Sequence, residues 1–149
     1  MRVWRISNYA DLSGMGGVLA AGRWNHRNTP IVYCADHPAS ALLEMLVHFD
    51  FEDMPTNYQL LEIILPDDIA VIRPDLAGDW REQEKATRDI GSRFIKDALA
   101  PVMAVPSVLV PFGTNYLLNP ALLFSAGVTM AGASRHTIDP RLRGEVAAL

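Results

Sequence analysis

The sequence contains a single cysteine, Cys34, among its 149 residues. One thiol excludes an intrachain disulfide framework and any zinc site built on four cysteines. The amino-terminal stretch MRVWRISNYADLSG carries charge and polarity where a secretory signal needs an apolar run. Both observations favour a protein that stays in the cytoplasm.

Basic residues are also few. The chain has 13 Lys and Arg against 17 Asp and Glu, which gives a formal net charge of −4. Proteins that bind nucleic-acid phosphates or anionic lipid usually carry a basic excess. We therefore expect no direct nucleic-acid partner.

Charged residues and histidine are missing altogether from residues 98–134. A run of this length is long enough to raise the question of a membrane span. Four prolines interrupt it and would break any spanning helix, namely Pro101, Pro106, Pro111 and Pro120. We predict strands and turns through a buried centre, and no membrane segment.

The familiar catalytic and metal signatures are absent from the chain. The glycines of GMGGVLAAG, residues 14–22, do not match the dinucleotide-binding fingerprint, so we interpret SGMGG as a flexible turn. No stretch has the phosphate-loop or nucleophile-elbow pattern. Cys34, His37 and His48 have a spacing that only weakly resembles a metal site. We predict no metal.

Hydrophobic periodicity predicts short strands and two helices. The strands are expected at residues 2–6, 29–35, 58–65, 105–110 and 116–118, and a mostly polar helix at residues 80–99. Strands and helices do not alternate strictly, which favours an α+β fold with a mixed sheet and flanking helices. The length, with no linker or repeat, predicts a single domain over residues 1–149.

The other helix is expected to begin after Asp36, which is a plausible cap with Pro38 in the first turn. Its predicted apolar face consists of Leu42, Met45, Leu46 and Phe49. Glu44 falls outside that face and shares a side with Ser40 and His48.

Five short stretches, taken in order, resemble the RES domain. They are GRWN at 22–25, TPIVY at 29–33, ALLE at 41–44, VPSVLVP at 105–111 and NYLLNP at 115–120. The resemblance runs from WRIS at 4–7 to DPRL at 139–142, which is nearly the whole chain. RES domains are the toxins of bacterial toxin–antitoxin pairs whose partner is an Xre-like antitoxin. The resemblance implies a fold similar to ADP-ribosyltransferases and an activity that destroys NAD by cleaving its bond to nicotinamide. NAD would thus be the substrate, with no cofactor needed.

The resemblance also implies a set of site residues. The arginine, glutamate and serine of the family name match Arg23 in GRWN, Glu44 in ALLE and Ser107 in VPSVLVP. Tyr33 matches a further pocket residue, and Arg5 in WRIS is a second basic candidate. Taken singly, each residue type has an ordinary structural role on a surface, in a turn or in packing.

The chemistry of NAD cleavage suits these residue types. Nicotinamide is a good leaving group, so the reaction passes through an oxocarbenium-like ribose that a carboxylate such as Glu44 can stabilise. The guanidinium of Arg23 matches a phosphate or pyrophosphate oxyanion. Tyr33 or Trp24 offers a flat face for nicotinamide, and the hydroxyl of Ser107 can fix the ribose or the amide.

The sequence leaves several alternatives open. The acceptor of ADP-ribose can be water, phosphate or a protein, so a protein ADP-ribosyltransferase is a rival to an NAD-degrading enzyme. A non-catalytic module that binds a nucleotide or peptide in the same cleft is a second rival. The identity of the antitoxin is not specified, and the oligomeric state can be a monomer or a homodimer.

Overall fold

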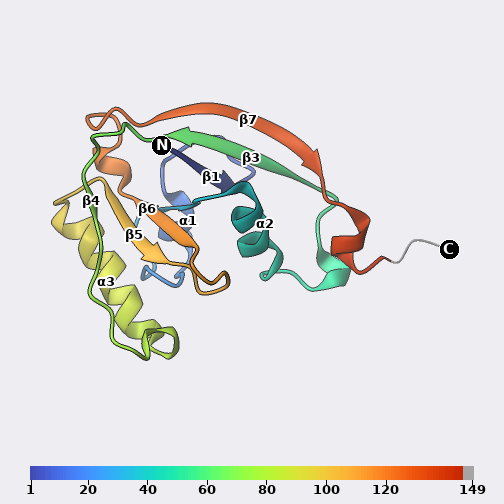
Figure 1. Cartoon of the computed structure of the whole chain (residues 1–149), viewed down its shortest axis with the longest axis horizontal. Helices are drawn as coiled ribbons and strands as arrows, with labels where there is room; N and C mark the ends of the chain where they lie inside the picture. The colour runs from blue at the N-terminus through green and yellow to red at the C-terminus, as the bar shows by residue number, and fades with distance from the viewer. Residues whose placement is uncertain (146–149) are drawn as a thin grey trace.

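The computed structural model describes residues 1–145, which form one seven-stranded sheet with helices packed around it (Figure 1). The strands are β1 (Arg2–Ile6), β2 (Val32–Ala35), β3 (Asn57–Ile64), β4 (Val71–Ile72), β5 (Val102–Pro106), β6 (Thr114–Leu118) and β7 (Thr129–Thr137). The α-helices are α1 (Met15–Leu19), α2 (Pro38–Leu46) and α3 (Glu84–Asp97). Short 3-10 turns lie at Phe51–Asp53, Trp80–Glu82, Pro120–Leu122 and Pro140–Arg143.

The strand order is β4-β5-β6-β2-β1-β3-β7, in which β4 and β5 are parallel and the other neighbours antiparallel. This mixed sheet confirms the predicted α+β class. The predicted domain ends at residue 149, and its last four residues lie outside the described part of the chain, so the boundary stays a prediction.

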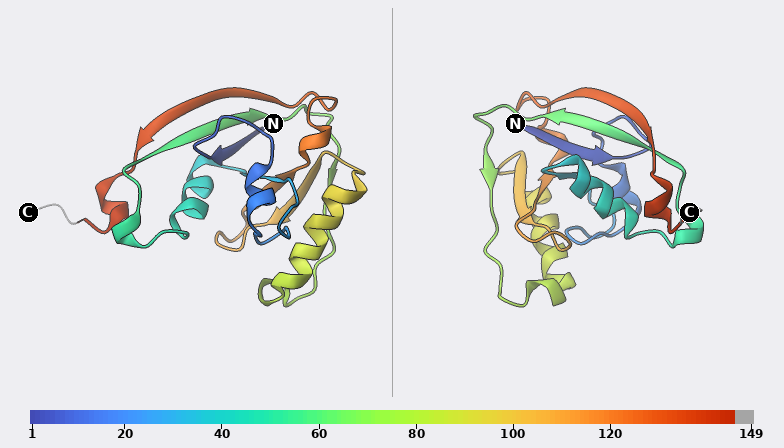
Figure 2. Two further views of the ribbon diagram at one scale, coloured as in Figure 1. Left: turned by 180° about the vertical axis from the view of Figure 1, so that it is seen from behind. Right: turned by 45° about the vertical axis from the view of Figure 1, so that its right-hand side comes forward.

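The sheet is strongly bent, and the helices lie on different parts of it. Strands β1, β3 and β7 arch over α2 (Figure 1), whereas α3 lies beside β5 and β6 (Figure 2). Alternate residues of β5 and β6 face opposite sides of the sheet. One side packs with α3 through Phe94, Met103 and Leu117, and the other joins Val102 and Leu118 to the residues of β1 and β3.

Strands β1 and β2 are joined much more weakly than their neighbours. They share one residue pair, Trp4 with Ala35, whereas β1 and β3 share five. We call this single pair the seam. Because the two strands diverge beyond it, α2 can pack against both of them and a cleft can open beside it.

Part of the uncharged segment of residues 98–134 is buried in the core, as the sequence predicts, whereas its part in β7 is mostly exposed. All residues of β5 before Pro106 are buried, as are Leu117 and Leu118 at the end of β6. Among residues 1–145, the helices are all too short or too polar to cross a bilayer.

Three predicted elements have boundaries in the structure that differ by three residues or more, whereas those of β3 and β6 differ by one or two. The strand expected at 29–35 begins only at Val32, because the amide of Thr29 donates to Gly17 on α1 instead of to a strand. The strand expected at 105–110 is β5, which ends at Pro106 before the chain turns at Ser107. The helix expected at 80–99 is a 3-10 turn followed by α3.

The interpretation of SGMGG as a flexible turn was wrong, because α1 begins within it. A Cβ atom at Gly17 would lie 2.2 Å from the carbonyl oxygen of Thr29, so glycine allows a close approach there. Strands β4 and β7 were not predicted. β4 has only two residues, and β7 is a mostly exposed edge strand without a clear apolar alternation.

Two predictions about α2 were also wrong. Its cap is His37, whose Nδ1 accepts from the amide of Ala39 at 3.0 Å, whereas Asp36 accepts from the amide of Thr114. The buried residues of α2 are Ser40 and Ala41, and the predicted apolar face is only half-buried or exposed. The helix packs on the diverging strands through small residues, which brings Glu44 towards the sheet.

Candidate active site

Two adjoining hollows lie where β1 and β2 diverge. Their volumes are about 400 and 460 Å³, and both are lined by Tyr33, Glu44, His48 and Asn115. Ligand pockets commonly have volumes of roughly 300–1,000 Å³. We call the hollow that also contains Arg5 the first hollow, and the one that contains Arg23 the second hollow.

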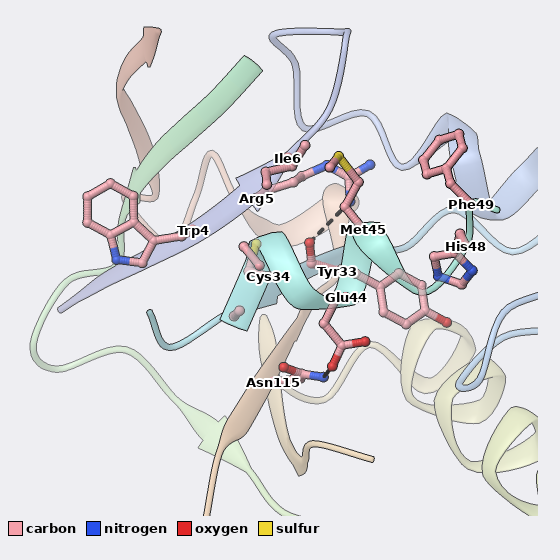
Figure 3. Close-up of a pocket in the computed structure, with 12 residues that line it drawn as sticks. Trp4, Arg5, Ile6, Tyr33, Cys34, Glu44, Met45, His48, Phe49 and Asn115 are labelled. Carbon is pink, nitrogen blue, oxygen red and sulfur yellow. Dashed lines mark hydrogen bonds between the residues drawn. The ribbon is translucent and has the colours of Figure 1, made fainter. Parts of the chain in front are cut away.

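Glu44 lies at the junction of the two hollows. Its Oε1 accepts two hydrogen bonds, from Ser107 Oγ at 3.2 Å and from Asn115 Nδ2 at 3.0 Å. Within residues 1–145, its Oε2 accepts no hydrogen bond from the protein. Figure 3 shows one carboxylate oxygen turned to Asn115 and the other turned towards the side where the Tyr33 ring lies. Glu44 therefore offers one free oxygen to a ligand.

Ser107 is buried, with 3% of its surface exposed, and its hydroxyl is fully occupied. Its oxygen accepts from the amides of Leu109 at 3.2 Å and Val110 at 3.0 Å, which leaves its hydrogen for Glu44. The backbone of Ser107 also pairs with Gly113 and closes the turn. The structure thus places Ser107 behind Glu44. Direct contact with a substrate, as the family resemblance implies, stays a prediction.

Tyr33 forms the wall between the hollows and is held at its hydroxyl. The hydroxyl donates to Asn25 Oδ1 at 2.5 Å and accepts from the amide of Trp24 at 3.0 Å. Burial raises the pKa of the Tyr33 phenol to about 12, so the ring is neutral at physiological pH. Asn25 is itself buried, and the two hydrogens of its Nδ2 are shared among the carbonyl oxygens of Gly17, Ala20 and His26 at 3.0–3.1 Å.

Trp24 belongs to the core. Only 2% of its surface is exposed, and its ring packs at 5.9 Å from that of Trp80. This burial disfavours Trp24 as a stacking surface and leaves Tyr33 as the aromatic candidate of the site.

Arg23 lines the second hollow together with Arg88. Its Nη1 donates to the carbonyl oxygen of Arg81 at 2.8 Å, and its Nη2 lies 3.6 Å from Glu84 Oε1. Arg88 pairs with the same glutamate at 3.3 Å and donates from Nε to Gly22. The two guanidinium groups lie on the same wall of the hollow, where they can bind an anion together, although Glu84 and Glu44 balance their charge.

Helix α3 fixes the loop that carries Arg23. Thr87 Oγ1 donates to the carbonyl oxygen of Arg23 at 2.7 Å. One turn further along α3, a Cβ atom at Gly91 would lie 1.7 Å from the carbonyl oxygen of Trp24. Glycine is therefore required where the helix meets the loop.

Arg5 reaches the first hollow from β1. Its Nη1 donates to the carbonyl oxygen of Tyr33 at 3.1 Å, across the diverging strands (Figure 3). The side chain thus satisfies a backbone group beside the seam. Its Nε is buried and has no partner among the described residues.

Cys34, His37 and His48, whose spacing weakly resembles a metal site, do not form one in the structure. His37 caps α2, whereas Cys34 and His48 line the first hollow. Burial raises the pKa of the Cys34 thiol to about 12, which keeps it protonated. Within residues 1–145, no three His, Cys, Asp or Glu side chains are grouped to hold a metal ion.

The structure thus brings together Arg23, Tyr33, Glu44 and Ser107, with Arg5 at the edge of the first hollow. Sequence reasoning missed Asn115 and Arg88. Asn115 lies in the stretch NYLLNP, but that stretch alone gives its amide no role. Arg88 is one of several charged residues on a polar helix, and its sequence context carries no signal of a site.

The arrangement can hold an anionic ligand and place a carboxylate beside it. Positive groups lie in the second hollow, a neutral aromatic ring stands at the junction, and Glu44 presents its free oxygen there. A carboxylate in this position can stabilise positive charge that develops on a bound sugar.

Solved structures share this fold. The chain aligns with a chain of the Mycobacterium tuberculosis MbcT–MbcA toxin–antitoxin complex at a TM-score of 0.70 and 17% identity, covering 96% of this chain and 86% of that chain.

Curated relatives match the sequence more closely. A protein named Toxin Res from Pseudomonas putida is 47% identical over 123 residues, which are 80% of this chain and 85% of the relative. The Prs ADP-ribosylating toxin from Sphingobium is 36% identical over 153 residues, covering 93% and 94% of the two chains. Relatives at this level of identity and coverage place the chain in a family of toxins.

The model of the RES domain matches residues 2–136. The chain therefore belongs to the RES domain family, as the five short stretches of sequence indicate.

Proposed function

We propose that this toxin cleaves the bond between nicotinamide and ribose in NAD, with Glu44 as its catalytic carboxylate. One observation carries the proposal: Glu44 stands at the junction of two hollows, held through one oxygen and free at the other. The name of the Sphingobium relative supports it, because ADP-ribosylation draws ADP-ribose from NAD by breaking this bond.

In the proposed reaction, the bond between the ribose C1′ and the pyridinium nitrogen breaks, and its electron pair leaves with neutral nicotinamide. Positive charge develops at C1′, and the free oxygen of Glu44 stabilises this charge. The same oxygen accepts a hydrogen bond from a ribose hydroxyl. Attack by water gives ADP-ribose and a proton, whereas attack by phosphate gives a phosphorylated ADP-ribose.

Arg23 and Arg88 would bind the pyrophosphate. Guanidinium groups match phosphate oxygens in two-pronged geometry, and the two arginines line the same hollow. In the structure, both arginines pair with the carboxylate of Glu84. Binding would exchange this half-exposed carboxylate for the more highly charged pyrophosphate.

A protein acceptor is the second candidate. The ADP-ribosylating relative is similar over almost the whole of both chains. In that case the chemistry at Glu44 is the same, and a side chain of a target protein replaces water or phosphate.

We further propose that an Xre-like antitoxin blocks the cleft. An enzyme that depletes NAD in the cytoplasm would arrest its own cell, so its activity requires a block. A terminal carboxylate or acidic segment of the antitoxin would bind Arg23 and exclude NAD from the second hollow.

The decisive experiment incubates the purified protein with NAD, with and without phosphate, and identifies the products by chromatography and mass spectrometry. Glu44→Gln keeps the shape of the side chain but removes its charge. We expect it to keep NAD binding and to lower kcat by about 100-fold or more. Nicotinamide release by Glu44→Gln at the parent rate would exclude Glu44 as the catalytic group, and no product from the parent would favour a non-catalytic binding module.

A further inference from the structure

Asn115 is the residue of the cleft that neither the sequence patterns nor the chemistry of NAD assigns. It lies on β6, where it is paired with Ala35 of β2 on one side and Val105 of β5 on the other. A residue between two paired neighbours has a fixed backbone, so its side chain starts from a rigid position. Asn115 also lines both hollows.

The orientation of the Asn115 amide follows from its neighbour. A carboxylate only accepts hydrogen bonds, so the group facing Glu44 has to be Nδ2, which lies 3.0 Å from Oε1 (Figure 3). The other end of the amide, Oδ1, is then buried and has no hydrogen-bond partner among residues 1–145.

A buried carbonyl oxygen without a partner lowers stability, and an apolar side chain at this position would avoid that cost. Because Oδ1 is buried, it is not available to a ligand in this conformation. The feature that justifies asparagine here is therefore the bond from Nδ2 to Glu44.

Ser107 supplies a second donor to the same oxygen, from the turn that follows the neighbouring strand β5. Both lone pairs of its hydroxyl accept backbone amides, so its hydrogen points to the same Oε1. Two donors, Asn115 on β6 and Ser107 in the turn after β5, thus fix one oxygen of the Glu44 carboxylate, which projects from α2. A side chain with one oxygen held in this way cannot rotate freely about its terminal bond.

We infer that Asn115 is a positioning residue that, together with Ser107, holds Oε1 of Glu44 so that Oε2 faces the reacting ribose. The inference rests on the proposed cleavage of NAD. In this role Asn115 acts through Glu44 and needs no contact of its own with the substrate. Loss of Nδ2 lets the carboxylate rotate, and misplacement by about 1 Å costs up to 100-fold in rate.

The test measures kcat and KM for nicotinamide release by the parent, Asn115→Ala, Asn115→Asp, Glu44→Gln and the double variant Asn115→Ala with Glu44→Gln. We expect Asn115→Ala to lower kcat by about 10- to 100-fold with KM within about threefold. Asn115→Asp keeps the size but replaces the donor by a second carboxylate, so its kcat falls at least as far. Asn57→Ala, an exposed asparagine at the start of β3, is the matched control and keeps parent kinetics.

The double variant separates positioning from direct contact. If Asn115 acts only through Glu44, the double variant turns over at the rate of Glu44→Gln alone, because there is no charge left to position. The thermal midpoint of Asn115→Ala should not fall, since the substitution also removes the unpartnered carbonyl.

Three outcomes would overturn the inference: parent kinetics in Asn115→Ala, a further loss of rate in the double variant, or a fall in thermal midpoint that matches the loss of rate. If Glu44→Gln has no measurable turnover, Ser107→Ala replaces it in the double-variant cycle. A change of KM in Asn115→Ala would also exclude the positioning role. A parent that releases no nicotinamide would instead refute the proposed function, which is a distinguishable result.

Discussion

Arg23 shows at the scale of a residue how one side chain can serve both the fold and the ligand. It donates to a backbone carbonyl of the 3-10 turn at Trp80–Glu82 through one nitrogen and leaves the other near Glu84. Its guanidinium is thereby held in place over the second hollow. Only the weak, half-exposed pair with Glu84 has to open when an anion binds.

We expect Arg23→Ala to raise KM for NAD by about 10- to 100-fold while kcat changes only severalfold, because a charge-assisted hydrogen bond contributes about 1.5–3 kcal/mol. Steady-state kinetics of nicotinamide release measure both constants. Arg27→Ala removes a nearby exposed arginine outside both hollows and is the matched control. A pure loss of kcat in Arg23→Ala would contradict its role in binding.

Cys34 and Tyr33 predict how stability depends on pH. Burial raises the pKa of the Cys34 thiol from 9.0 to about 12 and that of the Tyr33 phenol from 10.0 to about 12. Above pH 9 the unfolded chain loses these protons while the folded chain keeps them, so the free energy of unfolding falls as pH rises from 9 towards 12.

Cys34→Ala removes the thiol from this equilibrium. Urea denaturation at pH 8 and at pH 10.5 should show a smaller loss of stability between the two values in Cys34→Ala than in the parent. The comparison uses the difference between pH values, because the smaller side chain also lowers stability at both. An equal loss in the two proteins would show that Cys34 does not titrate as the structure indicates.

At the scale of elements, the contact between α3 and the loop of Arg23 decides the geometry of the second hollow. Gly91→Ala should stabilise an isolated helix by about 1 kcal/mol, but here the new Cβ would meet the carbonyl oxygen of Trp24 at 1.7 Å. We expect the clash to prevail, with a net loss of about 1–3 kcal/mol in unfolding free energy and reduced NAD binding.

Gly16→Ala on α1 is the control, since a Cβ there would meet no atom within 4 Å outside its chain neighbours and its own helix backbone. It should leave stability unchanged or slightly higher in thermal and urea denaturation. Equal effects of the two substitutions would exclude the close contact of α3 with the loop.

The elements that sequence patterns could predict are those with a strong local signal. The mixed α+β class, β1, β3 and the uncharged centre follow from periodicity and composition, and the structure confirms them. The presence of α1 in the glycine-rich stretch and the buried side of α2 depend on close packing against distant segments. Such contacts leave no periodic trace in the sequence.

The residues of the site also divide into those with a local sequence signal and those placed only by tertiary contacts. Arg23, Glu44 and Ser107 could be picked out because each matches a short stretch typical of the RES domain. The bond from Asn115 to Glu44 joins residues 71 positions apart, and no local rule brings them together. Trp24 had a side chain suitable for stacking, but its burial against Trp80 is a tertiary effect.

At the scale of the whole molecule, the proposed activity predicts toxicity that depends on one carboxylate. Expression of the chain alone in bacteria should arrest growth and deplete cellular NAD, whereas Glu44→Gln should do neither. Co-expression with an Xre-like antitoxin encoded beside the gene should restore growth and NAD. Equal toxicity of the parent and Glu44→Gln would contradict the enzymatic basis.

The net charge of −4 is consistent with a toxin that leaves contact with DNA to a separate antitoxin. If an Xre-like antitoxin is the partner, as proposed above, we expect any binding to DNA to belong to the antitoxin, since an acidic balance disfavours contact with phosphates.

The occupied hydroxyl of Ser107 has a consequence for chemical reactivity. A serine next to a glutamate in a cleft is an obvious target for reagents that acylate or phosphonylate activated serines. Here the oxygen has both lone pairs engaged by backbone amides and is almost entirely shielded. It is therefore a poor nucleophile towards any electrophile. If the proposed site is correct, we expect inhibitors to act by binding the open oxygen of Glu44 and the arginines of the second hollow, and not by modifying Ser107.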